Sequence, residues 1–138
     1  MSQGTKISSA IMFVQELDRS VSFYLEVLSL ELVDRSPTAA LLISQAGAQL
    51  ILRSMGGNAP HALGSVGVQY VVWTADGADG LPRCEQALRE RSAHVETRTC
   101  EGVSVVEGRD PDGTVVVVTY PGPDQLPLHK LPVRIYGW

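Results

Sequence analysis

The sequence is poor in cysteine and in aromatic residues, and it contains no long apolar run. Its two cysteines, Cys84 and Cys100, lack the C-x-x-C spacing of a redox or metal motif, so each is expected to be a buried thiol. No apolar stretch approaches the roughly 20 residues that a membrane-spanning helix requires, and Met1 to Lys6 shows no hydrophobic signal region. These absences predict a cytoplasmic protein without a membrane partner.

Positive charge and catalytic motifs are also scarce. The formal net charge is −4, whereas nucleic-acid binding requires a basic stripe, so no nucleic-acid partner is expected. No Ser-His-Asp or Cys-His arrangement is discernible, and Gly56-Gly57 is an isolated pair rather than a phosphate-binding loop. The histidines form no cluster along the chain, since they stand at His61, His94 and His129. The sequence therefore offers no ready-made catalytic constellation.

The chain instead contains one pattern of elements twice. Each half reads as a strand, a helix and three short strands, and the two copies are offset by about 60 positions. This repeat predicts a single α+β domain, residues 1–138, built from two tandem βαβββ modules. The expected parts are the module 7–54, the linker 55–65, the module 66–120 and the tail 121–138. The tail is too apolar to be solvated, so it is expected to pack on the body or on a partner subunit.

Two strings carry a resemblance to a known family. LDRSVSFYLEVLSLELV (Leu17 to Val33) and RDPDGTVVVVT (Arg109 to Thr119) resemble the vicinal oxygen chelate superfamily, which includes glyoxalase I, extradiol dioxygenases and bleomycin-resistance proteins. The resemblance implies paired βαβββ modules that form a curved mixed sheet around a cleft. In metal-dependent members, His, Gln or Glu side chains on the first and fourth strands of each module hold the metal ion. Both strings are structural, so the function depends on the cleft.

The family's metal positions are nearly empty of ligands in this chain. By the family's pattern, five residues back from Val14 and from Thr74 lie Ser9 and Gln69, and seven residues after Asp110 lies Val117. The fourth position falls near Ile51. Only Gln69 is a credible ligand there, and Ser9 is a weak neutral one. The aliphatic side chains cannot donate to a cation, and the neighbouring positions contain no histidine or carboxylate. Neither a metal ion nor another cofactor is therefore expected.

Strand alternation predicts which side chains line the cleft. The expected ligand-binding residues of the first module are Ser9, Ile11, Phe13, Gln49, Ile51 and Arg53. Those of the second module are Gln69, Val71, Trp73, Val117 and Thr119. Trp73 and Phe13 are the candidate stacking surfaces, and Tyr70 is assigned to the opposite face of its strand.

One carboxylate is a weak catalytic candidate. Glu107 ends a predicted strand and could point inward as a general base or as an anchor for a cation. A solvated residue at a strand end is the plainer interpretation.

These observations favour a binding protein over an enzyme. We expect a metal-independent protein that sequesters a small aromatic or apolar drug or metabolite, similar to the bleomycin-resistance branch, and the resemblance implies a homodimer. One alternative is a lyase, isomerase or dioxygenase of the superfamily with a displaced or absent metal site. Another is an interaction module without a small ligand, whose cleft is filled by its own side chains or by the tail. A bound aromatic compound would favour the first interpretation over both alternatives.

Overall fold

The computed structural model describes residues 4–56, 68–100 and 102–121 of the chain. The chain divides into two compact units, Met1–Pro60 and His61–Trp138, and each is described by itself. Most of the predicted linker and nearly all of the predicted tail lie outside the described residues. Among the described residues, no helix is both long and apolar enough to cross a membrane.

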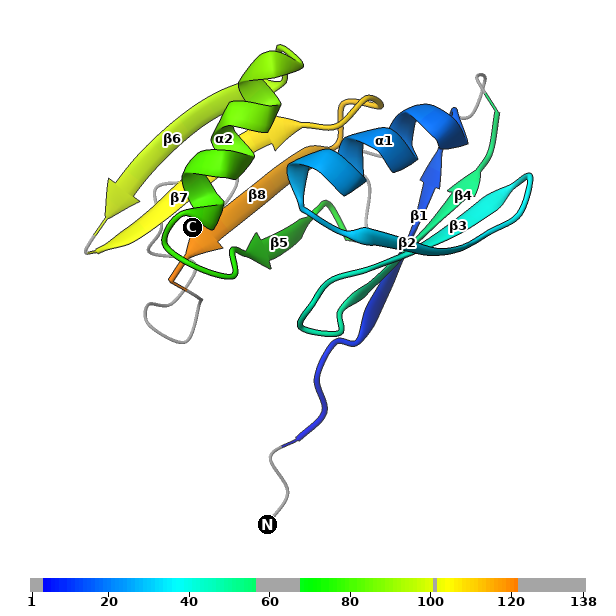
Figure 1. Ribbon diagram of the computed structural model, residues 1–138, viewed down its shortest axis with the longest axis horizontal. Coiled ribbons are helices and arrows are strands. Elements are labelled where there is room, and N and C mark those ends of the chain that lie inside the picture. Colours follow the sequence, from blue (N-terminus) through cyan, green and yellow to red (C-terminus); the bar gives the residue numbers. More distant parts are fainter. Residues whose placement is uncertain (1–3, 57–67, 101, 122–138) are drawn as a thin grey trace. The chain divides into compact units, whose positions relative to one another are not determined.

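The first unit is a four-stranded mixed sheet with one helix, as Figure 1 shows. Its elements are β1 (Ser9–Val14), α1 (Leu17–Val27), β2 (Glu31–Arg35), β3 (Ala39–Ile43) and β4 (Gln49–Ser54). The strand order is β1-β4-β3-β2, in which β1 runs parallel to β4 and the other neighbours are antiparallel. This order confirms the predicted βαβββ module.

One face of this sheet is covered by α1. Leu42, Leu50 and Leu52 on β3 and β4 are fully buried, and so is Tyr24 on the helix at 1% exposure. Arg35 on β2 marks the same face, because it pairs with Asp18 of α1 and is in register with Ala40 of β3. We call this side of the sheet the helix face and the other side the open face. The hydrophobic core of the unit lies between α1 and the helix face.

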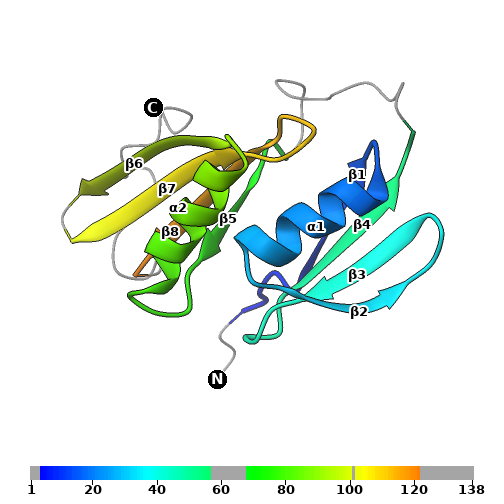
Figure 2. The same cartoon turned by 45° about the horizontal axis from the view of Figure 1, so that its top comes forward.

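The second unit repeats this architecture, which Figure 2 shows from another angle. Its elements are β5 (Val71–Thr74), α2 (Gly80–Glu90), β6 (His94–Cys100), β7 (Val103–Arg109) and β8 (Val115–Tyr120). The strand order is β5-β8-β7-β6, and β5 runs parallel to β8. The predicted α+β fold of two tandem βαβββ modules is therefore confirmed.

Helix α2 approaches its sheet most closely at Gly108. A Cβ atom at this position would lie 2.7 Å from Leu88 Cδ2 of α2 and 2.8 Å from the backbone oxygen of Ala93. Glycine is required here because any side chain would push the helix away from β7. Gly108 therefore marks the helix face of the second sheet.

The Asp-Pro-Asp-Gly turn connects β7 to β8. The Asp110 side chain is 5% exposed, and its Oδ1 accepts hydrogen bonds from the backbone N–H groups of Asp112 and Thr114, both at 2.9 Å. Gly113 takes a φ of 86°, which a side chain would disfavour. The motif thus sets the geometry of this hairpin and is structural, as predicted.

Candidate functional site

The open face of the first sheet carries the side chains that the sequence analysis selected there. Ser9, Ile11 and Phe13 on β1 are in register with Gln49, Ile51 and Arg53 on β4. Strand partners in register project to the same face. Ile11 and Phe13 are 61% and 64% exposed, whereas Leu50 and Leu52 between them are fully buried under α1. The predicted face is confirmed for this unit, and the ligand-binding role of these residues stays a prediction.

Strands β3 and β2 extend this face with residues that the sequence analysis missed. Leu41 of β3 is in register with Ile51, and Ile43 is in register with Gln49. Glu31 and Asp34 of β2 follow at the far edge, next to Ile43 and Leu41. The sequence did predict an antiparallel hairpin of these two strands. Because paired residues of a hairpin project to the same face, the partner of Ile51 could have been assigned to that face. The surface is therefore an apolar strip with Arg53 near one end and two carboxylates at the β2 edge.

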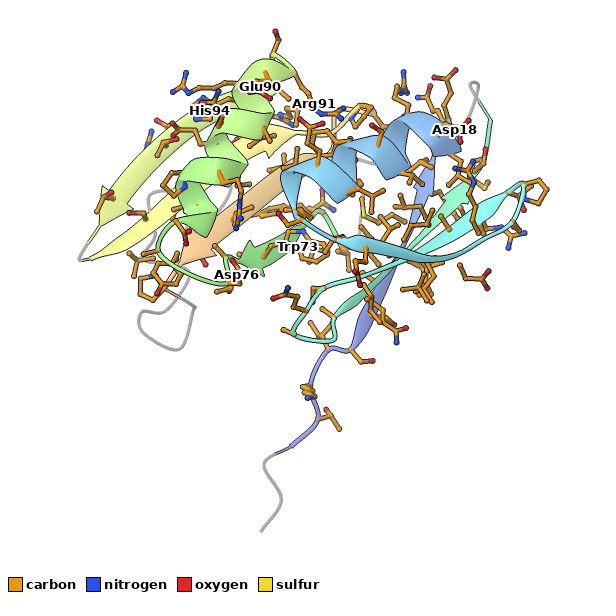
Figure 3. All side chains as sticks on the ribbon, viewed as in Figure 1. Asp18, Trp73, Asp76, Glu90, Arg91 and His94 are labelled. Atoms are coloured by element: carbon orange, nitrogen blue, oxygen red, sulfur yellow. The ribbon has the colours of Figure 1, made fainter. Side chains whose placement is uncertain are left out.

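In the second unit, the predicted face of β5 was wrong. Val71 and Trp73 are in register with Val116 and Val118 of β8, and Val116 is itself in register with Gly108. Gly108 meets Leu88 of α2, so Val71 and Trp73 belong to the helix face. Figure 3 labels Trp73 on β5. Gln69, two residues before Val71, falls outside the strand as observed.

The open face of the second sheet instead carries Tyr70 and Val72. Val72 is in register with Val117, and both residues pack against a cluster of buried valines. That cluster contains Val103, Val105, Val115 and Val117. The cause of the error is a slip of one residue, because the count back to the metal position began at Thr74. A one-residue slip exchanges the two faces of a strand.

The register between strands identifies the corrected position. Ile11 is in register with Ile51, and Val72 is in register with Val117, so Val72 is the counterpart of Ile11. Two residues earlier in each strand, Tyr70 is then the counterpart of Ser9. Tyr70 therefore replaces Gln69 among the four family positions.

These four side chains do not fit a divalent cation. Ser9 and Tyr70 offer neutral hydroxyl groups, and Ile51 and Val117 offer no donor atom. Structural and catalytic sites of divalent ions rely on imidazole, thiolate or carboxylate ligands. Within the part of the chain that the structure describes, no group of three or more His, Cys, Asp or Glu side chains could hold a metal ion. The residues at the family's metal positions in each unit therefore do not support chemistry through a metal ion.

Glu107 is the most unusual residue of the second open face. It lies inside β7, in register with Val117 on one side and Glu96 of β6 on the other. Its side chain is only 6% exposed, so the interpretation as a solvated strand end was wrong. Glu96 is paired with Arg98, two residues further along β6, at 2.5 Å. A buried carboxylate beside valines is uncommon in a protein interior, which makes Glu107 a candidate for chemistry.

Thr119 shares the face of Glu107 and Val117, as predicted. It is in register with Val105 of β7 and is fully buried. Its hydroxyl donates to the backbone oxygen of Trp73 over a long 3.5 Å. The described polar groups of this face are thus few and set among valines.

A separate polar cluster joins α2 to β6. The Thr97 hydroxyl donates its one proton to Glu85. It therefore accepts the 2.7 Å hydrogen bond from His94, whose Nε2 carries the proton. Arg89 Nε donates to the other Glu85 oxygen at 3.3 Å. The Thr97 hydrogen bond, above all, lowers the pKa of the Glu85 carboxyl below its ordinary value. Figure 3 labels His94 where β6 begins. Through Thr97 and Glu85, this residue helps to hold β6 against α2.

Of the other cysteines and histidines considered in the sequence analysis, only Cys84 has a described side chain. Cys84 is buried on α2, and burial raises the pKa of its thiol to about 12, so it stays protonated and unreactive. This confirms the expected buried thiol at this position. The side chain of Cys100 and the residues His61 and His129 lie outside the described part of the chain.

Comparison with known proteins identifies a family pattern over most of the chain. The family model of the Glyoxalase/Bleomycin resistance protein/Dioxygenase superfamily matches residues 6–118. None of the curated proteins compared matches the sequence.

Solved structures share the fold. A glyoxylase/bleomycin resistance protein/dioxygenase domain from Frankia sp. EAN1pec is 19% identical with a TM-score of 0.72, covering 85% of this chain and 98% of its own. A glyoxalase/dioxygenase from Nostoc punctiforme is 18% identical with a TM-score of 0.71, covering 86% of this chain and 94% of its own. Lactoylglutathione lyase from Agrobacterium tumefaciens is 20% identical with a TM-score of 0.65, covering 86% and 95%. At these identities the likeness concerns the fold alone.

Proposed function

The chain belongs to the glyoxalase/bleomycin resistance protein/dioxygenase superfamily, and we propose that it binds a flat, largely apolar drug or metabolite without a metal ion. The exposed apolar strip on the open face of the first sheet is the observation that carries this proposal. Ile11 and Phe13 present 61% and 64% of their surface there, next to the partly exposed Ile51. Contiguous exposed apolar surface with a polar rim is typical of a binding site.

The chemistry of this strip suits stacking and apolar contact. Phe13 supplies an aromatic ring, and its register partner Arg53 supplies a planar cation beside it. Gln49 offers a neutral amide for an oriented hydrogen bond. Sequestration requires no catalytic group, and these side chains supply a stacking surface and polar groups for it.

The lack of donors at the family's metal positions supports a metal-independent mode. Ile51 and Val117 offer no donor atom, and each stands in register with a further aliphatic residue, Ile11 and Val72 respectively. An apolar contact replaces a coordinate bond at both positions. The ligand is therefore held by surface complementarity rather than by chelation.

The test is a thermal-shift screen of planar aromatic compounds in the presence of EDTA. A compound that binds only the native state raises the melting temperature. Replacement of Phe13 by alanine is expected to weaken the binding of such a compound by about 5- to 30-fold, from the loss of about 1–2 kcal/mol of stacking and apolar contact. Isothermal titration calorimetry of both proteins measures this change.

Trp73→Phe is the matched control, because Trp73 is aromatic but belongs to the helix face. Its affinity for the same compound is expected to stay within about twofold of the original protein. Two results contradict the proposal: compounds that bind only after a divalent ion is added, and compounds whose affinity Phe13→Ala leaves unchanged.

A second function, metal-free acid–base catalysis by an isomerase or lyase, is favoured by one observation. Glu107 is 6% exposed among valines, an environment in which a carboxylate has no advantage for stability over an apolar residue. A general base in such a site removes a proton next to a carbonyl group and returns it at another carbon of the substrate, so no oxidant or metal is needed.

Deuterium incorporation distinguishes catalysis from binding. A compound found in the screen is incubated with the protein in D₂O, and NMR follows exchange at its carbon-bound protons. An enzyme exchanges them, and Glu107→Gln is expected to slow the exchange at least about 100-fold while Glu96→Gln does not. If the original protein incorporates no deuterium, or if Glu107→Gln exchanges as fast as the original protein, the catalytic role of Glu107 is wrong.

A further inference from the structure

Arg53 is the one arginine in the described part of the chain whose guanidinium group has no partner there. The other described arginines all interact with a neighbour. Most of them form ion pairs with carboxylates, namely Arg19, Arg35, Arg83, Arg89 and Arg98. Arg109 donates to the Gly113 backbone oxygen at 3.1 Å, and Arg91 interacts as well. The open face of the first sheet therefore carries a positive charge that no described carboxylate neutralises.

The neighbours of Arg53 within the sheet are apolar. Its register partner on β1 is Phe13, and its partner on β3 is Ala39, whose side chain is a single methyl group. Ile51, two residues earlier on β4, projects to the same face. Apolar neighbours displace part of the water around a guanidinium group, so its hydrogen bonds to an anion are stronger than in open solvent. Arg53 is therefore placed to bind a carboxylate next to an aromatic ring.

The far edge of the same face is negative. Glu31 and Asp34 of β2 lie there, in register with Ile43 and Leu41 of β3. Strand β3 separates β2 from β4, as Figure 2 shows, which places β2 about 10 Å from β4. An anion is thus attracted to the end of the strip at Arg53 and repelled from the β2 edge. This difference in charge gives a bound anion one favoured orientation.

We propose that the ligand of this face is a planar aromatic compound with a single carboxylate, which Arg53 binds while the ring lies on the apolar strip. The proposal rests on the metal-free binding function proposed above and names the class of ligand that the same face selects. Every group involved belongs to one sheet. A second carboxylate at the far end of the ligand would meet Glu31 and Asp34, so a dicarboxylate is rejected by repulsion.

Calorimetric titration with three naphthalene probes, in the presence of EDTA, tests this selection. 2-Naphthoate is expected to bind at least about fivefold more tightly than 2-naphthamide, which has nearly the same shape but no charge. 2,6-Naphthalenedicarboxylate is expected to bind at least about threefold more weakly than 2-naphthoate. Both differences should shrink in about 1 M salt, because salt screens exposed charges.

Arg53→Gln removes the charge but keeps a polar side chain of similar length. This variant is expected to bind 2-naphthoate no more tightly than 2-naphthamide, while its affinity for 2-naphthamide stays within about twofold of the original protein. Arg35→Gln is the matched control, because Arg35 belongs to the helix face of the same sheet and is paired with Asp18. It should keep the full preference for the carboxylate.

The repulsion at the β2 edge has its own variant. Replacement of Glu31 by glutamine together with Asp34 by asparagine removes both negative charges from the open face. This double variant is expected to bind the dicarboxylate within about twofold of 2-naphthoate. Circular dichroism confirms that each variant is folded before its titration.

Several results would overturn the proposed ligand class. In the original protein, 2-naphthamide could bind as tightly as 2-naphthoate, or the dicarboxylate could bind as tightly as the monocarboxylate. Arg53→Gln could also keep the preference for the carboxylate. If no probe binds but other planar compounds from the thermal-shift screen do, only the ligand class is wrong. If no planar compound binds at all, the proposed binding function fails with it.

Discussion

Replacement of Leu52 by alanine is expected to lower the free energy of unfolding by about 2–5 kcal/mol. Leu52 is fully buried on the helix face of β4, in register with Met12 of β1 and Ala40 of β3. The truncated side chain leaves a cavity under α1 that the surrounding leucines cannot fill, because protein cores are close-packed. Urea denaturation followed by circular dichroism measures the loss.

Arg53→Ala is the matched control for Leu52, because the two residues are adjacent on β4 and project to opposite faces. Arg53 is exposed, so its truncation is expected to change stability by only about 0.5 kcal/mol. Similar losses for the two variants would mean that β4 does not have one buried and one open face. The open face proposed for ligand binding would then be wrongly assigned.

A methyl group at Gly108 is expected to destabilise the second unit by about 1–3 kcal/mol. The new Cβ would lie 2.7 Å from Leu88 Cδ2 and 2.8 Å from the Ala93 backbone oxygen. A leucine side chain can rotate away, but a backbone oxygen cannot, so β7 or α2 must shift. Thermal denaturation of Gly108→Ala measures the effect.

Gly77→Ala is the control for this substitution. A Cβ at Gly77 would meet only the Asp79 side chain, at an ordinary contact distance of 3.4 Å. Its stability is expected to stay within about 0.5 kcal/mol of the original protein. If Gly108→Ala is equally harmless, α2 does not lie against β7, and the assignment of Trp73 to the helix face loses its reference point.

The first open face could be predicted because its strands alternate clearly. Leu50 and Leu52 flank Ile51 on β4, and this alternation separates buried from exposed positions before any fold is known. The same reasoning failed for the second unit. Val115 to Val118 are all valines, so the sequence of β8 contains no alternation from which a face could be chosen.

The error at β5 and the surprise at Glu107 share one cause. Trp73 was assigned by counting residues along the chain, and the count was off by one position. Glu107 was interpreted as solvated because the sequence shows only where a strand ends. Both assignments depend on hydrogen-bonded partners in β7 and β8, which lie far away in the sequence. Register is a property of strand pairs, and a single strand does not contain it.

The sequence by itself determined the two βαβββ modules, the amphipathic helices and the Asp-Pro-Asp-Gly turn, because each of these is encoded by local periodicity or turn chemistry. Only the tertiary structure decided that Tyr70 rather than Trp73 shares the face of Val117, and that Glu107 is buried. It also showed which strands are the outer ones of each sheet, β1 and β2 in the first and β5 and β6 in the second. A period of two defines two faces and two edges for every strand, but only the neighbouring strands and the helix determine which of them are covered.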